Sequence, residues 1–183
     1  MLLAFSLVLA LPVLPLDTTV TFGVVKRDLT GDTIPEVLTL VGTGRTIESL
    51  QVTFTIASEG QSLRLQSWRL TPASFDTQRQ ISAAEYRTRL GEYGGWFFSE
   101  TRFMSPRMFL SWLQASSRRG VRLIPVAIAR DIALNDTVRA RRIWEQMQGA
   151  PITVFQFSPG GDRIQFIAWS ATERRFYDLL ECC

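Results

Sequence analysis

The chain has 183 residues, of which 46% are hydrophobic and 20% charged, with 20 basic and 17 acidic side chains. This is the composition of a globular protein that can bury one sizeable core, and it excludes a disordered chain or one embedded in a membrane throughout. The absence of histidine excludes Ser–His and Cys–His catalysis and zinc sites built from imidazole.

The first sixteen residues form an apolar run that ends in Pro12 and Pro15. The run has the length of a signal peptide and falls short of the roughly 20 residues of a membrane-spanning helix. It carries no Lys or Arg ahead of the apolar residues. We expect residues 1–16 to be a signal peptide, which implies export to the periplasm or the outside. The alternative is that this run is the first buried element of the fold.

Residues 17–70 predict a four-stranded antiparallel meander, because stretches of alternating or β-branched residues are separated by turns rich in Gly and Asp. In one stretch Leu50, Val52, Phe54 and Ile56 fall on the same face. The expected strands are Asp17–Arg27, Glu36–Val41, Leu50–Ile56 and Leu63–Leu70.

The middle of the chain changes to helical spacing. A helix is expected to start at Ser82, with Glu85 at capping-box spacing, and to end near Glu92 ahead of Gly94–Gly95. Another follows Ser105–Pro106. The remaining expected helices cover about 121–132, despite Pro125, and from Asn135 or Asp136 to about Gln148.

The last third returns to strands, expected at Ile152–Phe157, Arg163–Trp169 and Arg175–Leu180. Strands, then helices, then strands predict an α+β fold. Antiparallel sheets would come from the N-terminal four-strand and C-terminal three-strand meanders, with the central helical segment packed against them. We expect residues 17–183 to form a single α+β domain.

The segment Asp28–Leu38 carries the most informative spacing in the chain. Oxygen-bearing side chains stand at the first, third, fifth and ninth positions of a loop, and the carbonyl group at the seventh is a natural further ligand. Calcium prefers six to eight oxygen ligands from carboxylates, carbonyls and water. The predicted metal ligands are Asp28, Thr30, Asp32, Ile34 and Glu36.

This stretch resembles the calcium loop of FG-GAP/VCBS-type repeats, whose pattern is Asp-x-Asn-Gly-Asp-Gly-x-x-Asp followed by an apolar strand. Asp28, Gly31 and Asp32 match the pattern directly, and Glu36 replaces the last aspartate. Thr30 replaces the amide or carboxylate, and Thr33 replaces the second glycine, where a positive φ is often needed. The resemblance implies a structural Ca²⁺. One such loop does not imply a propeller.

The alternative to a metal loop is a plain hairpin, in which Asp28 and Asp32 cap the turn through backbone hydrogen bonds. Both interpretations use the same residues, so the sequence leaves the choice open.

Aromatic residues concentrate between Tyr93 and Trp112, around Gly94–Phe98. They are expected to pack in the core, and the alternative is an apolar pocket. Glu92 and Glu100 flank the cluster and would serve glycoside chemistry only if both faced one cleft. The adjacent Cys182 and Cys183 admit either two thiols or a disulfide outside the cytoplasm.

The sequence contains no catalytic signature, so no catalytic residue is assigned. Its basic residues are scattered, without the basic stripe and stacking aromatics of a nucleic-acid domain, so no nucleic-acid partner is expected. We expect an exported, non-enzymatic binding or structural module, stabilised by calcium, with an unknown protein or envelope ligand as partner and no membrane span after signal cleavage. The alternative is a hydrolase of the cell envelope that uses carboxylates and a metal, with Glu92, Glu100 or Asp131 near the loop.

Overall fold

The computed structural model describes residues 18–46, 49–75, 80–116, 120–132, 136–160 and 163–182. The predicted signal peptide, residues 1–16, lies outside this range, as do Cys183 and the side chain of Cys182.

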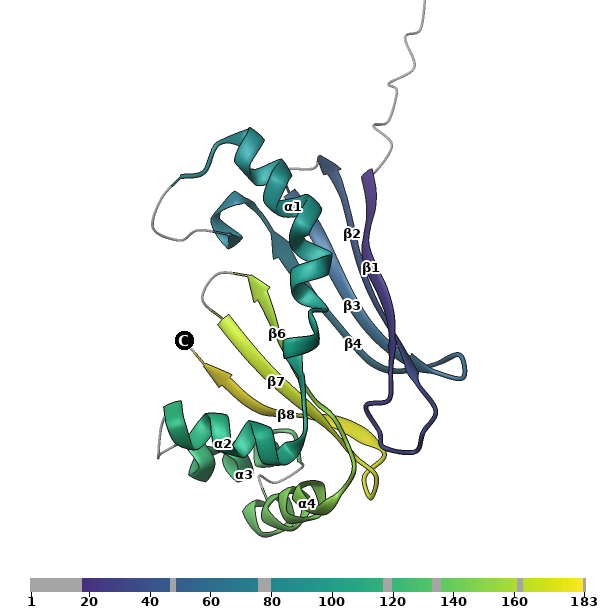
Figure 1. The fold of residues 1–183 in the computed structure, drawn as a ribbon, viewed down its shortest axis with the longest axis vertical. Coiled ribbons are helices and arrows are strands. Elements are labelled where there is room, and N and C mark those ends of the chain that lie inside the picture. The colour runs from purple at the N-terminus through teal and green to yellow at the C-terminus, as the bar shows by residue number, and fades with distance from the viewer. Residues whose placement is uncertain are drawn as a thin grey trace, which may run out of the picture.

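Two antiparallel sheets of four strands form the body of the molecule (Figure 1). The first sheet has the order β1-β2-β3-β4, as the predicted meander requires. Leu50, Val52, Phe54 and Ile56 are all buried, so the alternation in this stretch predicted its inward face correctly. The strands are β1 (Thr18–Arg27), β2 (Glu36–Thr46), β3 (Ser49–Ser58) and β4 (Gln61–Leu70).

The second sheet has the order β5-β6-β7-β8, one strand more than predicted. The additional strand is two residues long and pairs Phe103 with Phe155 and Met104 with Val154. A strand this short has no periodicity to read, which is why the sequence did not reveal it. The strands are β5 (Phe103–Met104), β6 (Val154–Gly160), β7 (Arg163–Ser170) and β8 (Arg175–Cys182).

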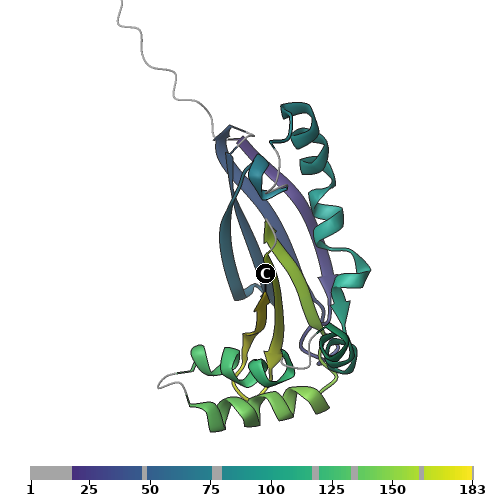
Figure 2. The same cartoon turned by 90° about the vertical axis from the view of Figure 1, so that its left-hand side faces the viewer.

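Helices cover the sheets in two places (Figure 2). One helix runs along the first sheet beside β1, while three gather at one end of the molecule and pack on β7 and β8. They are α1 (Ala83–Phe97), α2 (Pro106–Ser116), α3 (Gly120–Arg130) and α4 (Thr137–Gly149), with short 3₁₀ turns η1 (Pro72–Ser74) and η2 (Glu100–Arg102). The predicted α+β class is therefore correct.

The second sheet is buried on both faces and separates two apolar clusters. Phe155, Phe157 and Ile167 point toward the first sheet and α1, while Val154 and Phe166 point toward α2, α3 and α4. The layers are thus sheet, sheet and helices, with α1 beside the second sheet on the inner face of the first.

The first helix continues through Gly94–Gly95 to Phe97, so the predicted end near Glu92 was wrong. A Cβ built at Gly94 would overlap the carbonyl oxygen of Phe22 in β1. The glycine is needed here for close helix–strand approach, which overrides its weak helix propensity.

Predicted helix starts agree with the observed caps. Ser82 Oγ accepts a hydrogen bond from Glu85 N at 3.1 Å. Asp136 Oδ1 accepts from Val138 N and Arg139 N at 3.0 and 2.9 Å, so Asp136 is the cap of α4. These bonds satisfy amides that a helix leaves without partners in its first turn.

Within the described part of the chain, no helix is long and apolar enough to cross a membrane.

Candidate functional site

The loop between β1 and β2 turns its aspartates onto its own backbone. Asp28 accepts hydrogen bonds from Gly31 N at 2.6 Å and Thr33 N at 3.0 Å. Asp32 Oδ1 accepts from Ile34 N at 2.8 Å. These are the bonds that the metal-free hairpin requires, and they hold the loop as a compact turn in which each aspartate retains further lone pairs.

Glu36 is the most buried acidic side chain of the loop, with 0% exposure. Its two carboxylate oxygens accept from Leu29 N at 2.7 Å and from Thr30 Oγ1 at 3.0 Å. Both donors are neutral. The structure therefore brings the predicted ligands Thr30 and Glu36 into direct contact inside the loop.

The backbone of the loop adopts positive φ values at the positions where the resemblance places glycine. Gly31 has φ 78° and Thr33 has φ 72°. A β-branched residue rarely takes this conformation, because its Cβ crowds the backbone. Thr33 is therefore strained, at the position where the resemblance led us to expect a positive φ.

The loop also joins the first sheet to the start of β6. Thr153 Oγ1 donates to the carbonyl oxygen of Asp28 at 3.0 Å, and Thr153 N donates to that of Leu29 at 3.2 Å. A Cβ at Gly31 would lie 2.7 Å from the carbonyl oxygen of Pro151. The shape of the loop thus sets how the entry to β6 packs against the first sheet.

The described residues include no group of three or more Asp, Glu, Cys or His side chains arranged to hold a metal ion. The carboxylates of Asp28, Asp32 and Glu36 serve separate hydrogen bonds, and the Ile34 side chain is half-exposed.

The predicted aromatic cluster divides into buried and exposed members. Tyr93, Phe97 and Phe98 are buried in the core, as expected. Burial raises the pKa of the Tyr93 hydroxyl, which donates to the carbonyl oxygen of Ser158 at 3.3 Å. Trp96 is instead 47% exposed and stands between two surface hollows.

The first hollow has a volume of about 350 Å³ and lies where η1, α1 and β6 meet. It combines the aromatic walls of Phe75 and Tyr93 with Arg89 and Glu92. Arg89 is already engaged, because it donates to Glu85 and to the carbonyl oxygen of Phe75, both at 2.8 Å.

The second hollow has a volume of about 430 Å³ and is walled by the end of α1, η2, β5, α2 and β6. The guanidinium of Arg102 lies 4.2 Å from the ring centroid of Trp96. Desolvation lowers the pKa of Arg102. The residues that line the second hollow are Trp96, Ser99, Thr101, Arg102, Met104, Met108, Trp112 and Gln156.

The acidic residues considered for hydrolysis lie in different places. Glu92 lines the first hollow, whereas Glu100 is exposed and forms an ion pair with Arg27. Asp131 lines a separate hollow between α3 and β8. Neither hollow is lined by residues of the Asp28–Glu36 loop.

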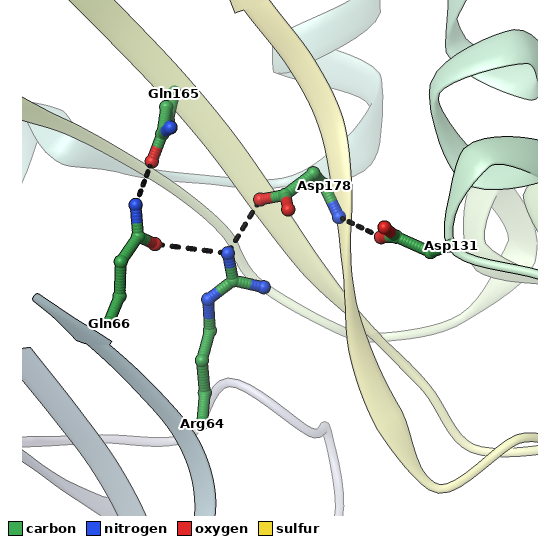
Figure 3. Close-up of polar contacts among 5 residues, drawn as sticks. All are labelled: Arg64, Gln66, Asp131, Gln165 and Asp178. Atoms are coloured by element: carbon green, nitrogen blue, oxygen red, sulfur yellow. Dashed lines mark hydrogen bonds and ion pairs between the residues drawn. The ribbon is translucent and has the colours of Figure 1, made fainter.

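A polar network between the two sheets has no counterpart in the sequence predictions (Figure 3). Arg64 on β4 donates to Asp178 on β8 at 2.6 Å and to Gln66 at 3.1 Å, and Gln66 donates to Gln165 on β7 at 2.6 Å. Burial raises the pKa of Asp178, and the Asp131 carboxylate adds to the rise, while Arg64 opposes it. Arg64 and Asp178 are 114 positions apart, so no local pattern links them.

Comparison of the chain with protein-family models, curated proteins and solved structures gave no match, so similarity assigns neither a family nor an activity.

Proposed function

We propose that the protein is an exported, non-enzymatic binding or structural module whose Asp28–Glu36 loop is stabilised by a structural calcium ion. Export is supported by the apolar run at residues 1–16. The hydrogen bonds of the loop fit a metal-free turn equally well, so the argument for calcium rests on the negative charge of the loop carboxylates.

The observation that carries the calcium proposal is the burial of Glu36. A fully buried carboxylate loses its hydration, and this cost is normally offset by a positive partner. The partners of Glu36 are a neutral amide and a neutral hydroxyl. No ion pair with a basic side chain is found for Asp28, Asp32 or Glu36 among the described residues. A divalent cation would supply the missing positive charge.

The role proposed for the ion is structural. The loop holds the entry to β6 through the bonds of Thr153 to Asp28 and Leu29. A catalytic metal needs an open coordination position and a nearby acid or base. The hollows lined by Glu92 and Asp131 include no residue of the loop. Glu100 pairs with Arg27, next to the loop, but its side chain is exposed and, among the described residues, not in a concave pocket shared with the loop. These positions favour the non-enzymatic module over the hydrolase.

Thermal melting with calcium and with a chelator tests the proposal. An ion at about 100 times its dissociation constant stabilises the native state by about 2.7 kcal/mol. For a chain of this length that corresponds to a rise in Tm of about 5–11 °C. Glu36→Gln removes the buried charge at nearly constant volume and should abolish the rise. Glu59→Gln, in the exposed β3–β4 turn, is the matched control and should retain it.

A wild-type melting curve that is unchanged across millimolar calcium would refute the metal and leave the plain hairpin. An equal rise in wild type and Glu36→Gln would place the ion elsewhere. Export is tested separately by N-terminal sequencing of protein recovered from the cell envelope, where an intact Met1 would contradict cleavage of a signal peptide.

A further inference from the structure

The second hollow, beside Trp96, is an open surface depression with the volume of a small-ligand site. Ligand sites typically occupy about 300–1,000 Å³, with mostly apolar walls and a few placed polar groups. This hollow has about 430 Å³. Its rim exposes large apolar side chains to solvent, since Trp96 is 47%, Met108 62% and Trp112 37% exposed.

The aromatic walls of the hollow are packed on neighbouring side chains. Trp96 stacks on Tyr93 at 6.1 Å between ring centroids, and the Arg102 guanidinium lies over the Trp96 ring. Trp112 packs on the buried Phe166 at 4.8 Å between centroids. Preorganised aromatic walls cost a ligand little ordering entropy when it binds.

The described residues give the hollow a single charge, which is positive. Among them, Arg102 is the only charged residue in its lining, and no carboxylate forms an ion pair with it. The desolvation that lowers the pKa of Arg102 means that this cation is partly withdrawn from water without an anionic partner. Such a site is electrostatically complementary to an anion.

The polar side chains that line the hollow besides Arg102 are Ser99, Thr101 and Gln156, together with the indoles of Trp96 and Trp112. Ser99 Oγ and Thr101 Oγ1 lie 3.2 Å apart and bond to each other, and both oxygens retain further hydrogen-bonding capacity. The guanidinium is the one donor among these groups that carries a charge, so an anionic head gains the strongest hydrogen bonds from this site. The exposed side chain of Met108 favours an apolar body for the rest of the ligand.

We propose that this hollow binds an amphiphilic carboxylate, with its head on the Arg102 guanidinium and its apolar chain along Met104, Met108 and Trp112. The inference rests on the proposed binding role and not on calcium. It gives the module a small-molecule ligand of defined chemistry: an apolar chain carrying one negative charge.

Titration with dodecanoate below its micelle-forming concentration tests the proposal. Binding is followed by calorimetry and by intrinsic fluorescence, because two of the five tryptophans line the hollow. Dodecan-1-ol, with the same chain and no charge, is the ligand control and should bind at least about tenfold more weakly, as expected from loss of a charge-assisted hydrogen bond.

Two variants separate the site from nonspecific binding. Arg102→Gln should weaken dodecanoate at least about tenfold and leave dodecan-1-ol unchanged. Met108→Glu places an acid on the exposed rim and should weaken dodecanoate while leaving the fold intact, since Met108 is 62% exposed. Val138→Glu, on the surface of α4 with 70% exposure, is the matched control and should bind as wild type.

Absence of saturable dodecanoate binding would overturn the proposal, and so would equal affinities for the acid and the alcohol or an unaltered affinity in both Arg102→Gln and Met108→Glu. Titrations with calcium and with chelator keep this test apart from that of the loop. A calcium-dependent rise in Tm without dodecanoate binding would sink this inference alone.

Discussion

Replacing Gly94 by alanine should destabilise the protein, although alanine is the better helix former. The new Cβ would overlap the carbonyl oxygen of Phe22 and lie 2.5 Å from its carbonyl carbon. Carbon atoms pack at about 3.5–4.0 Å, so the contact with the carbonyl carbon alone would require α1 and β1 to separate by at least about 1 Å, and the closer carbonyl oxygen requires more. Both groups at this contact are backbone, which no rotamer change can relieve.

The cost follows from the packing around that contact. Separation would loosen the edge-to-face pair of Phe22 and Tyr93, whose ring centroids are 5.3 Å apart. Overpacking of this kind costs about 1–3 kcal/mol or more. The gain in helix propensity returns at most about 1 kcal/mol. Since the clash is with backbone atoms, we expect the upper part of the overpacking range, about 2–3 kcal/mol, and hence a net loss of about 1–2 kcal/mol for Gly94→Ala.

The same helix provides matched controls. Gly91 and Gly95 are exposed, and a Cβ at either would meet nothing within 4 Å. Gly91→Ala and Gly95→Ala should therefore gain about 0.5–1 kcal/mol. The difference of about 1.5–3 kcal/mol should separate Gly94→Ala from either control by about 3–12 °C in thermal melting. Equal stability of the three variants would refute the close approach of α1 to β1 at Phe22.

Two further changes test the loop and the polar network. Gly31→Ala and Gly60→Ala both force alanine into a positive φ, of 78° and 80°, but only at Gly31 would the Cβ also strike the Pro151 carbonyl. In urea denaturation, Gly31→Ala should be less stable than Gly60→Ala by about 1–3 kcal/mol. Equal losses of stability would contradict the packing of the loop against the residues that precede β6. Burial raises the pKa of Asp178 above its usual 3.8, so the folded chain keeps this proton to higher pH than the unfolded chain, and the free energy of unfolding falls as pH rises between the two values. Asp131→Asn removes the neighbouring negative charge and should make this fall in stability smaller, by about 1.4 kcal/mol for each unit by which the pKa of Asp178 returns toward its usual value. Urea midpoints measured across pH test this expectation. Parallel pH profiles of wild type and variant would contradict an electrostatic interaction between Asp131 and Asp178.

The sequence predicted the parts of the fold in which one residue's environment depends on its near neighbours. The alternation from Leu50 to Ile56 identified the inward face of β3, and Ser82 marked the start of α1. It failed where a distant segment decides the outcome. Gly94 reads as a helix breaker until Phe22 is placed against it, and β5 exists only because β6 offers Phe155 as its partner.

The same distinction applies to the candidate sites. The Asp28–Glu36 loop is contiguous, so its spacing could be read directly, and the structure adds the burial of Glu36 and the contact with Thr153. The hollow beside Trp96 is assembled from five elements spread between Trp96 and Gln156. The aromatic density around Trp96 was the one signal of it in the sequence, and density alone cannot separate the exposed Trp96 from the buried Phe97.

The loop and the hollow are physically adjacent through one residue. Arg27 ends β1 immediately before the loop, pairs with Glu100 in η2, and lies 5.4 Å from the ring centroid of Phe103. The 3₁₀ turn η2 also contains Arg102, so this contact could in principle couple calcium to ligand. The free energy of the Arg27–Glu100 ion pair is too small for strong coupling. Glu100 is largely exposed, and exposed ion pairs contribute about 0–1 kcal/mol. A coupling of that size changes an affinity by at most about fivefold, below the tenfold effect expected for Arg102→Gln. The two proposals therefore succeed or fail on separate measurements.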